Sequence, residues 1–490
     1  MSLDPSADEI RRWGKAAINA MADHLSSIRD RSVYPATTSA AIRERLVTAL
    51  PEDGRTFDEL LETFTETIVP LTRQNAHPRM FGYVQGPGTA IAAVADLLAS
   101  TLNANLTVWR SAPSAVELER LTIDWIKQIV GFEADAAGLF VSGGSMANFS
   151  ALASARHAVA PDASRSGMQS SSRQLRVYCS DQTHHSIAKA AALLGIGRDN
   201  VREVSTDERF KVRADELERM IEEDLAAGYL PFCIVANAGT VMTGACDQIA
   251  ALRDVADRHG LWLHVDGSYG GFATLAASVH PLFAGMERAD SISLDPHKWL
   301  YLPVDCGCVL YRDAAAARAA FAHEAEYTRV LAQQADESFA YWDYGPELSR
   351  RFRALKVWMM LQLVGMRPLR EALEKDLACA RKLEALVHAS SDFEMLAPVE
   401  LSIFCFRYVP THLRSDATAR DIASEQELDA VNEQLLLALQ QDGNSYLSNA
   451  QINGRFGLRG CVMNFRTQLD DVRILLDDLR RLAAAVDHAT

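Results

Sequence analysis

The chain has 490 residues, a formal net charge of −15, 48% hydrophobic residues and 23% charged residues. This composition is typical of a folded globular protein with two or three structural units. The negative charge, without any Lys/Arg-rich run, argues against a nucleic-acid partner. No stretch of about 18 apolar residues and no signal-peptide core occur, which predicts a cytoplasmic protein without a membrane-spanning helix. The eight cysteines form no CxxC pair and no metal-type spacing, which predicts reduced thiols and no metal site.

The first expected element is an amphipathic helix over residues 9–31. Apolar residues recur there at three- and four-residue steps, and a second amphipathic stretch follows at 57–71. An apolar stripe of this kind needs a partner surface, which the chain's own body or a second subunit could supply. We expect residues 1–76 to form an N-terminal helical segment that takes part in dimer formation.

The central part of the chain alternates short apolar runs with helical segments. The runs are 138–141, 176–180, 232–236, 261–265, 291–294 and 306–311. Such alternation is typical of βα units in a mostly parallel sheet with helices on both faces. It predicts a large domain over residues 77–375.

From about residue 376 helical patterning returns. It is interrupted by extended runs at 401–408 and 456–464 and closes with a helix at 469–486. This pattern predicts a small α+β C-terminal domain over residues 376–490.

Two charged residues follow apolar strands in the central part. Lys298, in Ser293-Leu-Asp-Pro-His-Lys-Trp299, comes directly after a short strand. Its amine is a competent Schiff-base nucleophile in apolar surroundings, although most lysines are solvated surface residues. Asp266 ends the run 261–265, where an unpaired carboxylate would be very costly. It could hold the protonated ring nitrogen of a bound pyridine, or cap a helix, or pair with an arginine.

Two further strand ends carry polar turns. In residues 138–148 a strand leads through a glycine turn into a helix, and the N–H groups of Gly144 and Ser145 would converge there on an anion such as phosphate. Such turns are common by themselves. His184 and His185 follow another strand, and one of them could lie flat on a cofactor ring, although a lone histidine is more often structural.

The order of these features along the chain resembles the group II pyridoxal-phosphate (PLP)-dependent amino-acid decarboxylases. Sequence motifs similar to those of the family extend over nearly the whole chain, in segments 77–83, 112–119, 238–240, 295–299 and 348–353. The resemblance implies an α/β PLP fold of type I (aspartate-aminotransferase-like) with a central mostly parallel sheet, helices on both faces, an N-terminal helical arm and a small α+β C-terminal domain. It also implies a homodimer, because the family builds its active site at the subunit interface.

The same resemblance implies roles for the residues that would hold PLP. Lys298 would carry the cofactor as a Schiff base, Asp266 would pair with the pyridine nitrogen, and His184 would stack on the ring. The expected phosphate ligands are Gly144, Ser145 and His297, and the expected further cofactor contacts are Thr240 and Ser268.

On the substrate side, the resemblance implies that Arg459 binds the α-carboxylate, where the alternative is an ordinary structural ion pair. Tyr327 matches the family's mobile-loop tyrosine, which returns a proton to the substrate Cα; Tyr341 and Tyr344 fit its spacing less well. Homologues with phenylalanine at that position can make aldehydes oxidatively, so a tyrosine favours simple decarboxylation. The expected side-chain contacts of the substrate are Tyr83, Val84 and Trp109.

Three sites depart from the common family pattern. Ser268 stands in Asp-Gly-Ser where the family commonly has Asp-Ala-Ala. Val84 and Gly86 replace a phenylalanine and a threonine that aromatic decarboxylases often carry. Asp295 replaces an asparagine near the phosphate, which an acid would repel unless it points elsewhere.

The sequence therefore predicts PLP-dependent α-decarboxylation of an L-amino acid to an amine and CO2. An aromatic substrate is the leading expectation because aromatic residues gather in the expected pocket segments (Phe81, Tyr83, Trp109 and Tyr327). Three alternatives stay open: a decarboxylase of an acidic amino acid such as glutamate, aspartate or cysteine sulfinate, a decarboxylation-dependent aldehyde synthase, and a non-catalytic PLP-binding scaffold.

Overall fold

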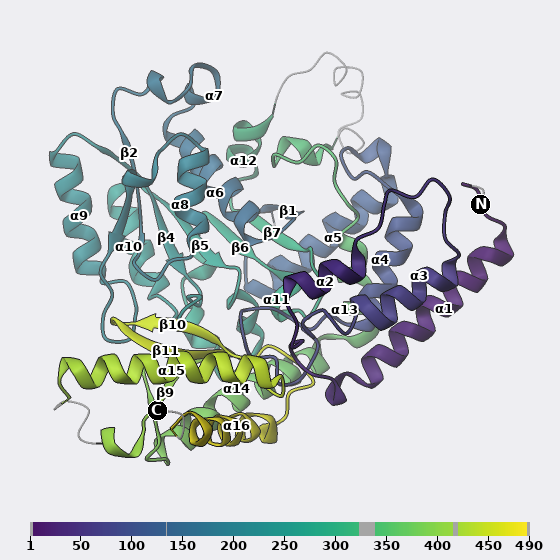
Figure 1. Ribbon diagram of the computed structural model, residues 1–490. Coiled ribbons are helices and arrows are strands. Elements are labelled where there is room, and N and C mark those ends of the chain that lie inside the picture. Colours follow the sequence, from purple (N-terminus) through teal and green to yellow (C-terminus); the bar gives the residue numbers. More distant parts are fainter. Residues whose placement is uncertain (1–2, 134, 323–338, 415–419, 488–490) are drawn as a thin grey trace. The chain divides into compact units, whose positions relative to one another are not determined.

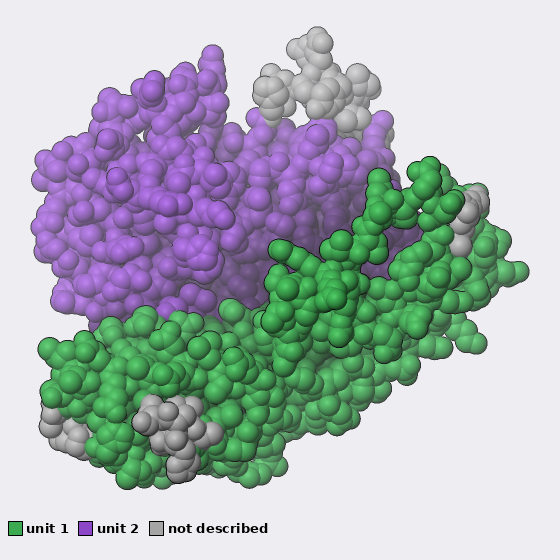
Figure 2. Space-filling model, viewed as in Figure 1, with its two compact units in different colours: residues 1–83, 382–396, 405–490 green, residues 84–381, 397–404 purple. Residues whose placement is uncertain are grey.

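The computed structural model describes residues 3–133, 135–322, 339–414 and 420–487. The chain forms two compact units, which Figure 2 colours separately. Unit 1 comprises Met1–Tyr83, Lys382–Leu396 and Cys405–Thr490, and unit 2 comprises Val84–Arg381 and Ala397–Phe404.

Unit 2 is built on a seven-stranded sheet with the strand order β1-β7-β6-β5-β4-β2-β3 (Figure 1). Its strands are β1 (Ala137–Val141), β2 (Leu175–Ser180), β3 (Val201–Val204), β4 (Leu230–Asn237), β5 (Trp262–Gly267), β6 (Ser291–Leu294) and β7 (Gly307–Tyr311). Strands β3, β2, β4, β5 and β6 run parallel, and β7 is antiparallel to both β6 and β1. The predicted mostly parallel sheet is thus confirmed.

The strands of this sheet are covered on both faces. Every residue of β2, β6 and β7 is buried, although successive side chains of a strand point to opposite faces. Helix α6 (Gly144–Val159) packs along β4, β5, β6 and β7. Helix α9 (Ala214–Ala226) packs on β3 and β4, and α10 (Ile249–His259) packs on β4 and β5. Burial on both faces explains why the parallel strands appear in the sequence as continuous apolar runs.

The remaining helices of unit 2 surround this core. They are α4 (Ala90–Leu102), α5 (Pro113–Val130), α7 (Ala163–Ser166), α8 (Ser186–Leu193), α11 (Pro296–Trp299), α12 (Ala314–Phe321), α13 (Ala354–Val364) and α14 (Met366–His388), the last of which ends in unit 1. Helix α5 begins with Pro113, which has no N–H to leave unsatisfied, and ends at Gly131 in the left-handed conformation.

Unit 1 carries most of a four-stranded sheet with the order β10-β11-β9-β8. Its strands are β8 (Phe393–Met395), β9 (Ile403–Tyr408), β10 (Ser448–Ile452) and β11 (Arg455–Cys461), and its helices are α1 (Ala7–Ser26), α2 (Ser39–Leu46), α3 (Phe57–Thr63), α15 (Ile422–Asp442) and α16 (Leu469–Asp487). The expected N-terminal helix is present as α1, which starts at a capping box formed by Ser6 and Glu9.

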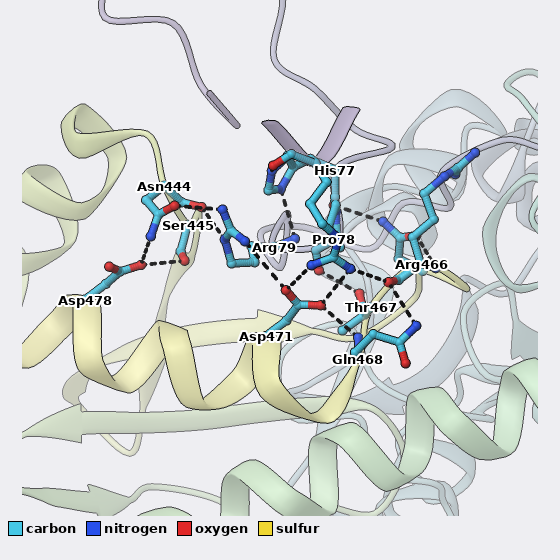
Figure 3. A network of polar contacts seen from close by, with 12 residues as sticks. His77, Pro78, Arg79, Asn444, Ser445, Arg466, Thr467, Gln468, Asp471 and Asp478 are labelled. Carbon is cyan, nitrogen blue, oxygen red and sulfur yellow. Dashed lines mark hydrogen bonds and ion pairs between the residues drawn. The ribbon is translucent and has the colours of Figure 1, made fainter. Parts of the chain in front are cut away.

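A polar network joins the N-terminal segment to the C-terminal part inside unit 1 (Figure 3). The Asp471 carboxylate, 1% exposed, accepts hydrogen bonds from Arg29 Nη1 at 2.8 Å and from the Gln468 N–H at 2.8 Å. Arg79 Nη1 lies 3.6 Å from the same carboxylate. A buried carboxylate is tolerated here because two guanidinium groups and a backbone N–H compensate its charge.

His77 extends the network to the backbone. Its Nδ1 accepts the Arg79 N–H at 3.0 Å, so its Nε2 donates to the Arg29 carbonyl at 3.2 Å. Burial lowers the pKa of His77 to about 4, which keeps the ring neutral. Asn464 Nδ2 donates to the His77 carbonyl at 2.9 Å, and Thr467 Oγ1 donates to the Pro78 carbonyl at 2.7 Å.

These bonds explain why the boundaries of the compact units differ from the predicted domain boundaries at residues 76 and 375. Residues 77–83 bond to C-terminal residues and fall into unit 1 together with 1–76. The three-part division into functional domains stays a prediction.

Replacement of Asp471 should destabilise unit 1 more than replacement of an exposed acid on the same helix. We expect Asp471→Asn to lower the free energy of unfolding by about 3 kcal/mol, because Arg29 and Arg79 lose their shared counter-charge. Asp477→Asn is the matched control on α16: Asp477 is 52% exposed and pairs with Arg473 and Arg480 at the surface, so its loss should stay below about 1 kcal/mol. Urea unfolding of both variants measures the difference, and equal losses would contradict this account.

Candidate active site

Unit 2 contains a cavity of about 480 Å³ at the carboxyl ends of its parallel strands. Ligands gather at this edge in open α/β sheets. Residues that follow β1, β2, β4, β5 and β6 all reach it. The described residues that line it are Val84, Ser142, Gly143, Gly144, Ser145, Met146, Asn148, His184, Asn237, Gly239, Val241, Asp266, Ser268, Tyr269, Asp295, His297, Lys298 and Val304.

One wall of the cavity is the turn from β1 into α6. A Cβ atom on Gly144 would lie 2.4 Å from Ser268 Oγ and 2.9 Å from Asp295 Oδ2, so only glycine fits there. The first N–H groups of the 16-residue helix α6 have no partner within the helix and carry its positive dipole end. Together with the exposed Ser145 hydroxyl, they form an anion-binding turn, defined here as residues 143–145.

Lys298 lies in the short helix α11 that follows β6. Its Nζ is 2.8 Å from Asp295 Oδ2, and His297 Nε2 is 3.8 Å from the same oxygen. Asp295 is 2% exposed, and its Oδ1 has no hydrogen-bond partner among the described atoms. Burial lowers the pKa of His297, whose Nδ1 lies 2.8 Å from the Cys306 carbonyl oxygen. Asp295 therefore faces the anion-binding turn and does not point elsewhere.

The residue after Lys298 is fixed firmly. Trp299 is fully buried, its ring stacks on Tyr269 at a centroid distance of 5.2 Å and an interplanar angle of 8°, and its indole N–H donates to Asp376 at 3.1 Å. A stacked and hydrogen-bonded tryptophan holds the backbone of α11 in place. The position of Lys298 is thus set by its neighbour.

Asp266, at the end of β5, has both carboxylate oxygens engaged. Oδ1 accepts the Ser268 N–H and the Ser293 hydroxyl, each at 3.1 Å, and Oδ2 accepts Asn148 Nδ2 at 2.8 Å. Burial acts to raise the pKa of Asp266, but nearby His264 and the hydrogen bonds outweigh it, so the pKa lies below its usual value. The cavity therefore presents a buried, ionised carboxylate.

His184 follows β2 and is half-buried at the cavity. Its Nδ1 lies 2.8 Å from Ser186 Oγ, and burial lowers its pKa. Eight of the predicted site residues thus line the cavity. Seven of them are expected cofactor contacts: Gly144, Ser145, His184, Asp266, Ser268, His297 and Lys298. The eighth is Val84, an expected contact of the substrate.

Other predicted site residues lie elsewhere. Thr240 is buried, and its hydroxyl forms a hydrogen bond with the Thr243 hydroxyl. Its neighbours Gly239 and Val241 line the cavity, whereas Thr240 is not among the described lining residues. Trp109, in unit 2, donates its indole N–H to Glu117 at 2.8 Å and is not a lining residue either.

Three predicted residues fall outside unit 2 or outside the described chain. Tyr83, 49% exposed, lies in unit 1 with its ring 4.7 Å from the Arg73 guanidinium. Arg459 is 4% exposed on β11 of unit 1, and its Nη1 donates to Ser448 Oγ at 3.3 Å. Tyr327 lies outside the described residues.

The sequence missed two amides at the cavity, Asn148 and Asn237. Asn148 could have been found, because it stands four residues after Gly144 in a helix, and residues i and i+4 share a helix face. Among the described residues, no group of three or more His, Cys, Asp or Glu side chains could hold a metal ion. None of the described helices is long and apolar enough to cross a membrane. All eight cysteines are buried, reduced thiols.

Comparison with known proteins decides which cofactor this cavity serves. Residues 40–409 match the family described as "Pyridoxal-dependent decarboxylase conserved domain". The chain belongs to this family. An aromatic-L-amino-acid decarboxylase of Bacillus atrophaeus is 34% identical over 99% of this chain and 98% of its own length, and a phenylacetaldehyde synthase of Arabidopsis thaliana is 28% identical over 93% and 92%.

The fold agrees with this family membership. The crystal structure of Oryza sativa TDC with PLP and tryptamine superposes with a TM-score of 0.91 at 28% identity, over 99% of this chain and 100% of that one. The protein is therefore a PLP-dependent amino-acid decarboxylase with the predicted fold of type I, and PLP is its cofactor.

The cavity of the decarboxylase fits PLP chemically. The anion-binding turn suits a phosphate, and its Gly144 position has no room for a Cβ. The ionised Asp266 suits a protonated pyridine nitrogen. Lys298 offers an amine beside both. One residue fits less well: the Asp295 carboxylate, with its unbonded Oδ1, faces the phosphate turn.

Neutralising Asp295 should strengthen cofactor binding. We expect Asp295→Asn to lower the Kd for PLP by about tenfold, because like charges a few ångströms apart repel by more than the corresponding 1.4 kcal/mol. The amide oxygen can still accept from Lys298. Asp290→Asn is a control, because Asp290 pairs with Arg253 at 2.7 Å and does not line the cavity. Equilibrium PLP titration by absorbance measures both, and an unchanged or higher Kd for Asp295→Asn would refute the repulsion.

Proposed function

We propose that this decarboxylase removes the α-carboxylate of an aromatic L-amino acid and releases the corresponding amine, as a cytoplasmic homodimer. The single observation that carries the proposal is the cavity of unit 2, in which Lys298, ionised Asp266 and the anion-binding turn face one space. The aromatic substrate is supported by the Bacillus relative, an aromatic-L-amino-acid decarboxylase, and by the Oryza sativa structure with tryptamine.

Different residues of the cavity would hold different parts of the cofactor. Lys298 would hold PLP covalently through its amine, and Gly144, Ser145 and His297 would hold its phosphate. Asp266 would keep a proton at the pyridine nitrogen. Hydrogen bonds to both of its carboxylate oxygens hold the carboxylate in one orientation for this role. Bound PLP supplies an electron sink for the electron pair that remains when CO2 departs.

Further roles concern the cofactor ring and the substrate. His184 would lie against the ring, with Ser268 and Thr240 as further cofactor contacts. Arg459 would bind the α-carboxylate and orient the bond that breaks. Tyr327 would return a proton to the substrate Cα.

The substrate side chain needs its own contacts beside the cofactor. Tyr83, Val84 and Trp109 are proposed to contact that side chain. Val84 is the one among them that lines the cavity within the described part of the chain.

Apolar side chains on helices of both units support a homodimer. In unit 1, α1 has no buried residue, and its Ile10 and Ile18 are 55% and 39% exposed. In unit 2, Leu97, Leu98 and Leu102 of α4 are all exposed. Exposed apolar patches of this kind mark interaction surfaces. A monodisperse monomer in sedimentation would contradict the dimer.

Two alternatives remain within the family. The first is oxidative aldehyde formation, because the Arabidopsis relative is a phenylacetaldehyde synthase. Tyr327 argues against this alternative, because a tyrosine at that position favours simple decarboxylation. A decarboxylase of acidic amino acids would need a cation for the substrate side chain. Among the described lining residues Lys298 is the one lysine or arginine, and it is assigned to the cofactor.

A panel of single amino acids tests the proposal. The PLP-loaded protein is incubated with L-tyrosine, DOPA, tryptophan, phenylalanine, histidine, glutamate or aspartate, and amines and aldehydes are identified by mass. We expect an amine and CO2 from an aromatic substrate. Amine from glutamate or aspartate would establish the acidic alternative, and aldehyde with ammonia and peroxide would establish the synthase.

Two variants assign the residues. Lys298→Ala should lose both the cofactor absorbance and turnover, and retained turnover would rule out its role. Tyr327→Phe should lower amine formation by about 100-fold or more, the range of a lost general acid. Aldehyde and ammonia should appear in its place, with dissolved O2 as the oxidant that is reduced to peroxide. Amine formation at the wild-type rate would show that another group returns the proton.

A further inference from the structure

Asn148 lies at the centre of the hydrogen bonds behind the cavity. It is 1% exposed on α6, four residues after Gly144. Its Nδ2 lies 2.8 Å from Asp266 Oδ2 and 2.9 Å from Ser186 Oγ, and its Oδ1 lies 2.9 Å from His264 Nε2. One amide on α6 thus bonds to groups on two other elements, β5 and α8.

The direction of these bonds follows from what each group can donate. An ionised carboxylate only accepts, so the NH2 group of Asn148 must face Asp266, and its carbonyl oxygen must face His264. His264 Nε2 must therefore carry a hydrogen.

The far side of His264 is compatible with the same tautomer. The indole N–H of Trp262 only donates, and it lies 2.8 Å from Ser291 Oγ. The Ser291 hydroxyl is then free to donate to His264 Nδ1 at 2.9 Å. Since the Asp266 carboxylate fixes the Asn148 amide and His264 is neutral, the hydrogen bonds run in one direction from Trp262 to Asp266.

A second branch of the network reaches His184. Ser186 Oγ accepts from Asn148, so its own hydrogen points to His184 Nδ1 at 2.8 Å, and the Ser186 N–H donates to the same nitrogen at 3.3 Å. His184 must then carry its hydrogen on Nε2. Burial lowers the pKa of His184 and lowers that of His264 to about 4, so both rings are neutral near pH 7, as these bonds require.

We propose that Asn148 is a positioning residue that fixes the Asp266 carboxylate and sets the Nε2–H tautomers of His264 and His184. The proposal rests on the roles proposed above for Asp266 and His184. It explains how α6 contributes both to binding the anion and to ordering these two side chains. Its first turn binds the anion, and its second turn orders the acid that holds the ring nitrogen and the histidine that faces the ring.

The side chain at 148 has little freedom to change. Alanine would leave Asp266 Oδ2 and the His264 N–H without their partner, each at the cost of a buried unsatisfied group. Aspartate would put two carboxylates within 2.8 Å of each other, so that one of them would have to take up a proton. Asparagine supplies both a donor and an acceptor at this site.

The test uses the full-length, PLP-loaded protein and the variants Asn148→Ala and Asn148→Asp. ¹⁵N NMR of selectively labelled histidines reports the tautomers of His184 and His264, assigned by loss of signal in His184→Gln and His264→Gln. PLP affinity is measured by absorbance after equilibrium dialysis. Asn432→Ala is the matched control, because Asn432 is fully buried in unit 1 and makes three hydrogen bonds, to Tyr408 and Leu428, away from the lining residues.

We expect wild-type His184 and His264 to be Nε2–H tautomers and Asn148→Ala to give mixed tautomers with PLP affinity about 10- to 100-fold lower. Asn148→Asp should weaken PLP at least as much. Asn432→Ala should lower stability without changing either readout. Unchanged tautomers in Asn148→Ala would overturn the proposal whatever the affinity, and so would equal affinity losses in Asn148→Ala and Asn432→Ala. Neither readout needs turnover, so an inactive wild type in the amino-acid panel would contradict the proposed function alone.

Discussion

The active-site cavity depends on one buried negative charge, the Asp266 carboxylate. A charge at the end of a central strand is stable only where donors surround it, and here Asn148, Ser268 and Ser293 supply them from α6, from the segment after β5 and from β6. The order of the strands, the glycine turn before α6 and the packing of α6 across the sheet all bring these donors together. The sheet therefore positions the charge, and the charge in turn fixes which side chains its neighbours can carry.

The sequence predicted those parts of the fold whose burial is uniform. Strands buried on both faces, such as β2, β4 and β7, appear as apolar runs and were predicted correctly. Strand β3 was missed because it lies at the edge of the sheet, and its Val-Arg-Glu-Val sequence has no apolar run. Strand β10 was missed because its burial alternates, with polar residues at the exposed positions. The grouping of the N-terminal segment with the C-terminal part depends on bonds such as Arg29 to Asp471, which no local pattern encodes.

The cavity could be predicted in part for a similar reason. Lys298, Asp266, His184 and the anion-binding turn each follow a strand end, so their convergence is a property of parallel sheets. Asn148 could not be recognised as easily, because one amide in an alanine-rich helix becomes important only through what packs against it. Asp295 was recognised as unusual, but only the structure shows that its carboxylate faces the turn that suits the phosphate.

The Arg29–Asp471 contact also constrains the order of events while the chain is being synthesised. The two residues are separated by 442 positions, so at about 5–20 residues per second Arg29 leaves the ribosome roughly 20–90 s before its partner. Unit 1 cannot be completed during that interval, whereas the strands and helices of unit 2 can already assemble. Ile10 and Ile18 of α1 are exposed both before and after unit 1 is completed, so the late contact does not cover them.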